Sequence, residues 1–152
     1  GLDGITISGG EPFAQPEALL ALLQVLHDWR NDARLNFDLL SYSGFSWRRL
    51  QRDFAPILAL LDAIIPEPFQ AQQPTRLIWR GSANQPLIPL SPLGEERYTP
   101  YLHQEVERRP FQLVVDDERV WGIGIPESGD MDRLEQQCAE RGVQLGGVSW
   151  RG

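Results

Sequence analysis

The sequence contains no lysine and only one cysteine in its 152 residues. All 14 basic residues are arginine, so the chain has neither a Schiff-base lysine nor a phosphate-loop lysine. The single cysteine, Cys138, excludes a disulfide within the chain and agrees with a reducing cytoplasm. One thiolate cannot hold an iron–sulfur cluster, which needs several, so we expect no metal site built by this chain alone.

Long apolar runs and clustered positive charge are absent as well. No apolar run reaches the roughly 18 residues of a membrane-spanning helix. The net charge of −7 argues against nonspecific nucleic-acid binding, which depends on clustered cations. His27 and His103 show no metal-ligand spacing. We therefore expect neither a membrane nor a nucleic acid as a partner.

The first half of the chain alternates between short β-branched runs and stretches with helical periodicity. The order strand, helix, strand, helix, strand is typical of right-handed crossovers over a parallel sheet. The predicted segments are a strand at 5–7, a helix at 15–30, a strand at 35–41, a helix at 47–61 that Pro56 kinks or divides, and a strand at 63–65.

The second half is less regular. Residues 77–79 are expected to add an edge strand, and the proline-rich residues 86–100 to form an extended connection. The segments predicted after these are a hairpin of 111–115 with 119–125, a helix at 129–141 capped by Gly142, and a last strand at 143–150. We therefore expect a domain at 1–90, a linker at 91–109 and a small β-hairpin and helix appendage at 110–152.

The most informative segment is Gly4-Ile5-Thr6-Ile7-Ser8-Gly9-Gly10-Glu11-Pro12-Phe13. Ile5 and Ile7 suit a buried strand that ends at Gly9 and Gly10, which can adopt positive φ angles that other residues avoid and leave the backbone open to a ligand. A Glu-Pro step then leads into a helix. Because α/β proteins bind ligands where a strand ends and a helix begins, we expect a small-molecule site here.

Ser8-Gly9-Gly10-Glu11-Pro12 resembles the "GGEP" motif of radical S-adenosylmethionine (SAM) enzymes. The resemblance implies an α/β fold in which parallel strands form a partial (β/α) barrel. It also implies that Gly9, Gly10, Glu11 and Pro12 bind the amino end of the methionine half of SAM, largely through backbone oxygens.

A second segment, Ser41-Tyr42-Ser43-Gly44-Phe45, is similar to a pattern found in glycyl-radical-enzyme activases after the third barrel strand. Anaerobic ribonucleotide reductase activases and their single-cluster relatives are the closest comparison. The resemblance places Ser43 and Gly44 near the SAM ribose. The alternative is that these residues form only a turn leading into a helix.

A third segment follows the next strand. In these activases an Asp precedes the strand and an Asp-Gly-Pro-Phe turn follows it. Asp62 and Pro68-Phe69 match, but Pro66 and Glu67 replace the Asp-Gly pair, which puts the geometry of the turn in doubt because glutamate lacks the backbone freedom of glycine.

A fourth segment, Leu77-Ile78-Trp79-Arg80-Gly81-Ser82-Ala83-Asn84-Gln85, resembles the "WRGSSNQ" segment of the same activases. Its polar side chains either build a turn or contact substrate or SAM. The candidate cleft-lining residues, taken over all segments, are Tyr42, Asp62, Arg80, Asn84 and Gln85.

The defining Cys-x3-Cys-x2-Cys motif of the family is absent. We expect that it lies upstream in a full-length parent, of which this chain is an N-terminally truncated part. The resemblance implies that the parent is an oxidoreductase with a [4Fe–4S] cluster, which cleaves SAM to a 5′-deoxyadenosyl radical. A glycyl radical enzyme and an electron donor would be its partners.

This chain alone is then expected to have no catalytic residue, no cluster and no SAM cleavage. Two alternatives stay open. One is a cluster-free module that binds SAM or a nucleotide, and the other is a structural α/β module whose glycine pair is only a tight turn.

Overall fold

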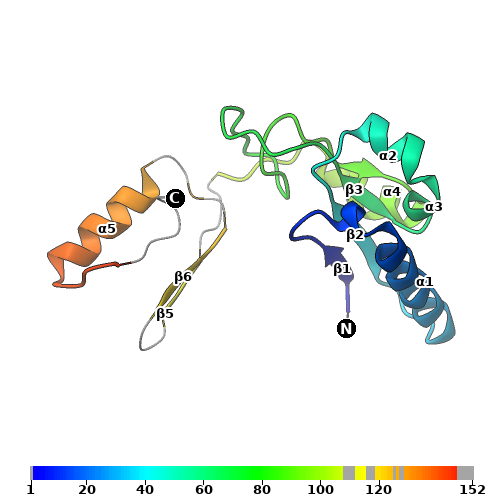
Figure 1. Ribbon diagram of the computed structural model, residues 1–152, viewed down its shortest axis with the longest axis horizontal. Coiled ribbons are helices and arrows are strands. Elements are labelled where there is room, and N and C mark those ends of the chain that lie inside the picture. The colour runs from blue at the N-terminus through cyan, green and yellow to red at the C-terminus, as the bar shows by residue number, and fades with distance from the viewer. Residues whose placement is uncertain (1, 108–111, 116–118, 125, 127–128, 147–152) are drawn as a thin grey trace. The chain divides into compact units, whose positions relative to one another are not determined.

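The computed structural model describes residues 2–107, 112–115, 119–124, 126 and 129–146 (Figure 1). The chain divides into two compact units, Gly1–Val106 and Glu107–Gly152. Within the described residues, no helix is long and apolar enough to cross a membrane.

The larger unit is built on one sheet. Its strands are β1 (Gly4–Ile7), β2 (Asp38–Tyr42), β3 (Ala63–Ile65) and β4 (Ile88–Pro89), which lie side by side in this order (Figure 1). The first three are parallel, with Ile5 opposite Leu39 and Ser41 opposite Ile64, and β4 is antiparallel to β3. The carboxyl ends of the three parallel strands therefore meet at one edge of the sheet.

Helices follow β1 and β2, as the sequence predicts, and two further helical segments follow β4. They are the 3-10 helix η1 (Pro12–Ala14), α1 (Pro16–Asp32), α2 (Trp47–Asp53), α3 (Ala55–Leu58), α4 (Pro92–Tyr98) and the 3-10 helix η2 (Thr99–Tyr101). Ser46 caps α2 by accepting a hydrogen bond from the Arg49 amide at 3.3 Å. The predicted division of the 47–61 helix is confirmed, because Phe54 separates α2 from α3 and Pro56 stands in the first turn of the latter.

Both faces of the sheet are covered, because successive side chains of a strand point to opposite faces. Leu39 and Ile64 pack with Leu23 of α1 and Leu50 of α2 in the main core. The second core cluster lies on the opposite face of the sheet, where the residues next to Leu39 and Ile64 in the strands pack with α4. Its buried members are Leu40, Ala63, Ile65, Leu87 and Tyr98. The near-continuous burial of β2 and β3 is typical of parallel strands.

Two sequence predictions in this unit are wrong. Residues 77–79 form no strand; Leu77 makes only an isolated bridge to Glu105, and β4 takes the place beside β3. Residues 86–100 are not an extended connection, because Ser91 caps α4 by accepting from the Gly94 amide at 3.0 Å. Pro92 stands in the first turn of α4, where its missing N–H costs nothing.

The smaller unit contains an antiparallel hairpin and a helix. The hairpin joins β5 (Gln112–Val115) to β6 (Val120–Ile123), and the helix is α5 (Asp130–Glu140), so both predictions are confirmed. Gly142 follows α5 with a φ of +77°, as expected of a C-terminal cap. Residues 143–146 form no strand, and the rest of the strand predicted at 143–150 lies outside the described residues.

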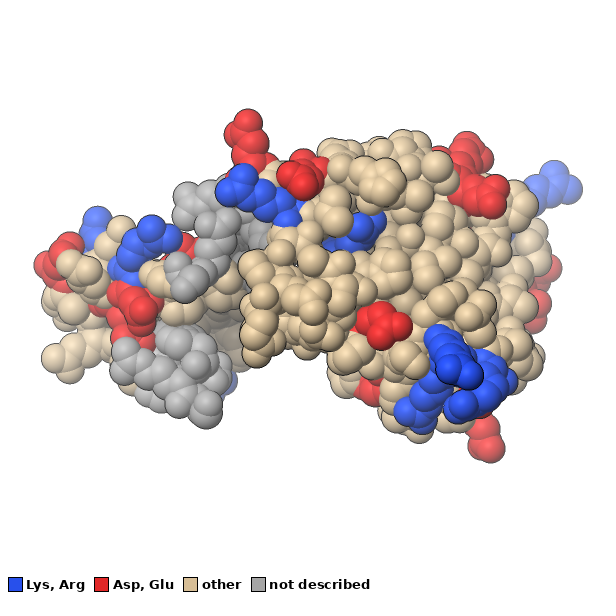
Figure 2. All heavy atoms as spheres, turned by 90° about the horizontal axis from the view of Figure 1, so that it is seen from above, with Lys and Arg blue, Asp and Glu red and all other residues tan. Residues whose placement is uncertain are grey.

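The chain is thus a mixed α/β protein with a second, antiparallel sheet, as predicted. Its main sheet runs from β1 to β4 within the described residues, and closure into a partial barrel stays a prediction. On the face shown in Figure 2, one group of basic side chains gathers on the larger unit, and acidic side chains are scattered around it. The net charge of the chain is −7.

Candidate functional site

The loop after β1 presents open backbone at two glycines. Gly9 and Gly10 have φ angles of +89° and +55°, a region in which other residues are strained. A side chain built on either glycine would meet no described atom within 4 Å beyond its chain neighbours. Among the described residues, no hydrogen bond is made to the carbonyl oxygen of Gly9 or Gly10. Space and backbone acceptors are therefore available to a ligand here.

The Glu11 carboxylate fastens this loop to the loop after β2. Its Oε1 accepts hydrogen bonds from the Phe13 amide at 3.0 Å and the Ser43 hydroxyl at 2.8 Å. Its Oε2 accepts from the Gly44 amide at 2.6 Å. The donors are all neutral, and no cation among the described residues pairs with Glu11. The site therefore holds a negative charge that a ligand cation would complement.

Ser43 and Gly44 directly follow β2, and hydrogen bonds fix their positions. The Ser43 amide donates to the Ile65 carbonyl at 3.0 Å, which extends the pairing of β2 with β3. The Ser43 hydroxyl donates to Glu11 and accepts from the Phe45 amide at 3.0 Å, so its one proton is used, and the residue is buried. A Cβ on Gly44 would lie 3.3 Å from Oε2 of Glu11, closer than the carboxylate tolerates without moving.

Pro12 contributes shape rather than a polar group. It begins η1, and its carbonyl accepts a hydrogen bond from the Gln15 amide at 3.2 Å. Its fixed φ suits the first residue of a helix, so it sets the direction of the chain directly after Glu11. The structure thus brings together Glu11, Ser43 and Gly44 and keeps Gly9, Gly10 and Pro12 beside them.

Tyr42, the last residue of β2, is tied to the next loop. Its hydroxyl donates to the Trp79 carbonyl at 2.5 Å, and burial raises the pKa of its phenol above 10.0. Trp79 has a φ of +61°, an unfavourable value for a tryptophan. The Tyr42 hydrogen bond therefore helps to hold a strained backbone segment at the carboxyl end of the sheet.

Asn84 and Gln85 make the contacts of turn-building residues. Nδ2 of Asn84 donates to the Pro68 carbonyl at 2.8 Å, and Nε2 of Gln85 donates to the Glu67 carbonyl at 2.8 Å. Oε1 of Gln85 accepts from the Gly81 and Ser82 amides at 3.0 and 3.1 Å. Of the two interpretations that the sequence leaves open, these contacts support the turn.

Asp62 does not share the edge of the sheet at which Glu11 lies, because it stands immediately before β3. It is 3% exposed, and its Oδ2 accepts from Arg30 at 2.7 Å and from the Leu39 amide at 2.9 Å. Its Oδ1 accepts from the Ser91 hydroxyl at 2.5 Å. These are the contacts of a structural ion pair at the amino end of the strands, not of a residue that lines a ligand site.

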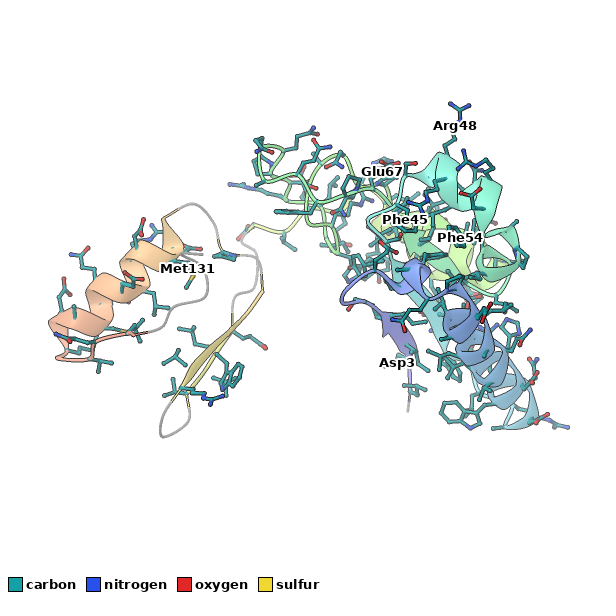
Figure 3. All side chains as sticks on the ribbon, in the orientation of Figure 1. Asp3, Phe45, Arg48, Phe54, Glu67 and Met131 are labelled. Carbon is teal, nitrogen blue, oxygen red and sulfur yellow. The ribbon has the colours of Figure 1, made fainter. Side chains whose placement is uncertain are left out.

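Glu67 has a part that the sequence did not indicate. It adopts a φ of +79°, so the turn keeps the left-handed conformation even though glutamate replaces glycine. Its Oε1 accepts from the Trp47 amide at 2.8 Å at the start of α2, and its own amide donates to the Phe45 carbonyl at 3.0 Å. Glu67 and Phe45 are labelled in Figure 3. These two hydrogen bonds offset a backbone strain of about 1–2 kcal/mol. No local sequence signal marks this contact, since Glu67 and Trp47 meet only in the fold.

Arg80 lies in the loop that Tyr42 holds. It is 9% exposed, and its Nη2 donates to the Leu102 carbonyl at 2.6 Å. Burial lowers the pKa of its guanidinium from the ordinary value. Arg80 therefore lies at the carboxyl end of the sheet, as Glu11 does, but the two make no direct hydrogen bond among the described contacts.

A comparison with protein families gives one match. A family model described as the 4Fe-4S single cluster domain matches residues 1–88, which is more than half of the chain. No curated protein and no solved structure matches the chain. The matched residues contain the whole Glu11 site and the loop that carries Arg80, and end before α4.

Proposed function

The chain belongs to the 4Fe-4S single cluster domain family, and from this premise we propose that it is the SAM-binding portion of a radical SAM iron–sulfur enzyme of the glycyl-radical-enzyme activase type. The observation that supports the proposal is the junction of Glu11 with Ser43 and Gly44. It places an uncompensated carboxylate beside the free carbonyl oxygens of Gly9 and Gly10, a set of acceptors that suits an ammonium group.

SAM fits the residues that are present. Its amino group would meet the Gly9 and Gly10 carbonyl oxygens and the Glu11 carboxylate. Ser43 acts by positioning Glu11, since its hydroxyl is already engaged, and the ribose would meet the exposed backbone of Gly44 instead. When bound in an enzyme of this type, SAM supplies the 5′-deoxyadenosyl group that takes a hydrogen atom from a substrate.

The iron–sulfur cluster of the family does not fit the residues of this chain. The only cysteine, Cys138, lies in α5 of the smaller unit. The described residues contain no group of three His, Cys, Asp or Glu side chains that could hold a metal ion. We assign the cluster ligands to cysteines outside these 152 residues, and a glycyl radical enzyme and an electron donor are the partners of that complete enzyme.

The single cysteine also favours a second candidate, a module that binds SAM or a nucleotide without a cluster. SAM binding by the chain agrees with both candidates. Formation of 5′-deoxyadenosine by the complete natural protein, reduced anaerobically with dithionite, agrees only with the first. Its absence from a protein that does bind SAM would select the second.

Isothermal titration of SAM into the 152-residue chain tests the binding site. We expect Glu11→Gln to weaken SAM binding at least about tenfold, because a hydrogen bond to a charged group contributes roughly 1.5–3 kcal/mol. Glu17→Gln is the matched control, because Glu17 is an exposed carboxylate in the first turn of α1 and its loss should leave affinity unchanged. Equal affinities of the wild type and Glu11→Gln would contradict the proposal.

A further inference from the structure

Arg80 is a buried arginine whose charge is not balanced by any carboxylate of the described residues. The guanidinium carries five N–H donors, yet its hydrogen bonding within the described residues is limited to the Leu102 carbonyl. Its Nε is completely buried and has no partner there. Burying a charged group without a counter-charge is costly, so this arrangement needs an explanation.

Two other partly buried arginines of the larger unit, Arg30 and Arg97, each form an ion pair with a carboxylate. Arg30 pairs with Asp62 at 2.7 Å, and Arg97 pairs with Asp38 at 2.6 Å. Arg97 also donates to the carbonyls of Asp3 and Asn36. Arg80 is more deeply buried than either of them, and no carboxylate of the described residues lies within ion-pair distance of it.

We propose that Arg80 binds an oxyanion, the carboxylate or phosphate group of a small-molecule ligand, at the carboxyl end of the sheet. A planar guanidinium matches the two oxygens of such a group and would recover the hydrogen bonds that it lacks in the free protein. Its Nη1 makes no hydrogen bond among the described residues and, unlike Nε, is not completely buried.

The segment around Arg80 is built rigidly, as a binding site requires. Trp79 is held at a φ of +61°, and its carbonyl is fixed by the Tyr42 hydroxyl. Backbone outliers of this kind are found preferentially at binding sites. The Trp79 and Tyr101 rings pack edge-on with centroids 5.2 Å apart and are 43% and 38% exposed, which offers apolar surface next to the charge.

The site is independent of the Glu11 site in its contacts, so the two can be tested separately. Tyr42, the last residue of β2, bonds to the loop that carries Arg80, and Glu11 follows the neighbouring strand β1. Together the two sites offer a negative and a positive group that have no ion-pair partner among the described residues. If the proposed function holds, the carboxylate of SAM is one source of the oxyanion. A free phosphate or the carboxylate of another metabolite is the other source.

NMR of the Arg80 Nε–Hε group in the 15N-labelled 152-residue chain tests this inference. We expect inorganic phosphate or acetate to shift this signal saturably at an ionic strength held constant with sodium chloride. Arg80→Gln identifies the signal, and Arg76→Gln is the matched control because Arg76 is an exposed arginine of the same loop. Anion affinity, followed by the backbone amides of the loop, should fall at least about tenfold in Arg80→Gln and stay unchanged in Arg76→Gln.

Two further arms identify the source of the oxyanion. A shift with SAM but not with 5′-methylthioadenosine, which lacks the carboxylate, would assign Arg80 to the methionine carboxylate. A shift with phosphate but not with SAM would assign a separate anion. The inference is overturned if no arginine Nε–Hε signal of the wild-type protein responds to any of these probes beyond its response to chloride, a result that needs no variant to fold. Gly9 and Gly10 amides report SAM binding in the same spectra, so failure at Arg80 is distinguishable from failure of the proposed function.

Discussion

The two ends of the parallel strands use charge in opposite ways. At the amino end, Asp62 and Asp38 are buried, and each is paired with an arginine and with a hydroxyl group. At the carboxyl end, Glu11 accepts hydrogen bonds only from neutral groups, and Arg80 has no carboxylate partner among the described residues. The charged groups at the amino end are therefore paired with one another. At the carboxyl end, Glu11 and Arg80 have no ion-pair partner among the described residues, so each can pair with a ligand.

This difference agrees with the general position of ligand sites in α/β proteins, outside the carboxyl ends of the strands. It also separates two kinds of polar residue that look alike in the sequence. Asp62 and Glu11 are both acidic residues next to a strand, but only the fold shows that one is used up by Arg30 and the other is not. The contrast predicts that substitutions at the amino end cost stability, whereas those at the carboxyl end cost binding.

The largest expected effect is that of Asp62→Ala on the free energy of unfolding. The substitution leaves Arg30, the Leu39 amide and the Ser91 hydroxyl without their acceptor, so we expect a loss of roughly 3–5 kcal/mol. Urea denaturation followed by circular dichroism measures it. Asp53→Ala removes an exposed carboxylate from a surface pair with Arg52 and should have a far smaller effect. Similar losses of unfolding free energy in the two variants would contradict the claim that the paired charges at the amino end stabilise the fold.

A smaller effect comes from Tyr98, which donates to Asp38 at 2.5 Å. Burial, helped by Asp38, raises the pKa of Tyr98 above the ordinary value of 10.0. A raised phenol pKa means that the folded state favours the neutral form, so its contribution to stability is complete below about pH 10 and is lost as the pH rises above it.

Denaturation at about pH 8.5 and about pH 11 measures this contribution. The free energy of unfolding of the wild type should fall between the two, and the fall should be smaller in Tyr98→Phe. Tyr42, whose pKa is raised by burial, accounts for part of the fall that remains. An equal fall in wild type and Tyr98→Phe would show that the Asp38 contact does not hold the phenol neutral.

The smallest expected effect is that of Glu67→Gly. Glycine relieves the strain of a φ of +79° but loses the hydrogen bond from Glu67 to the Trp47 amide at the start of α2. Because the two terms are each on the order of 1 kcal/mol, the free energy of unfolding should change by less than about 1 kcal/mol. Glu67→Ala, which keeps the strain and loses the cap, is the control and should be clearly less stable than the wild type.

Much of the fold follows from local signals in the sequence. β3 lies at the predicted residues, Ser46 caps α2 as expected, and the hairpin and α5 of the smaller unit are where the pattern places them. The position of Glu11, Ser43 and Gly44 at one edge also agrees with a parallel sheet, whose strands bring their carboxyl ends together, but only the fold shows the hydrogen bonds that join them.

The rest depends on contacts between distant residues. The prolines of residues 86–100 favour an extended chain and so do not predict α4, whereas Ser91 as its cap and Pro92 in its first turn allow a helix. The pairing of Asp62 with Arg30 joins residues 32 positions apart, and no local pattern marks it. The left-handed Glu67 breaks a local preference because tertiary hydrogen bonds hold it there.

The central claim is that the carboxyl end of the sheet binds SAM. Backbone amide NMR of the 15N-labelled chain during a SAM titration tests it most directly. We expect saturable shifts at Gly9, Gly10 and Gly44, with no comparable shift at Leu39, whose amide bonds to Asp62 at the amino end. Unchanged glycine signals at millimolar SAM, or shifts of similar size at both ends, would contradict it.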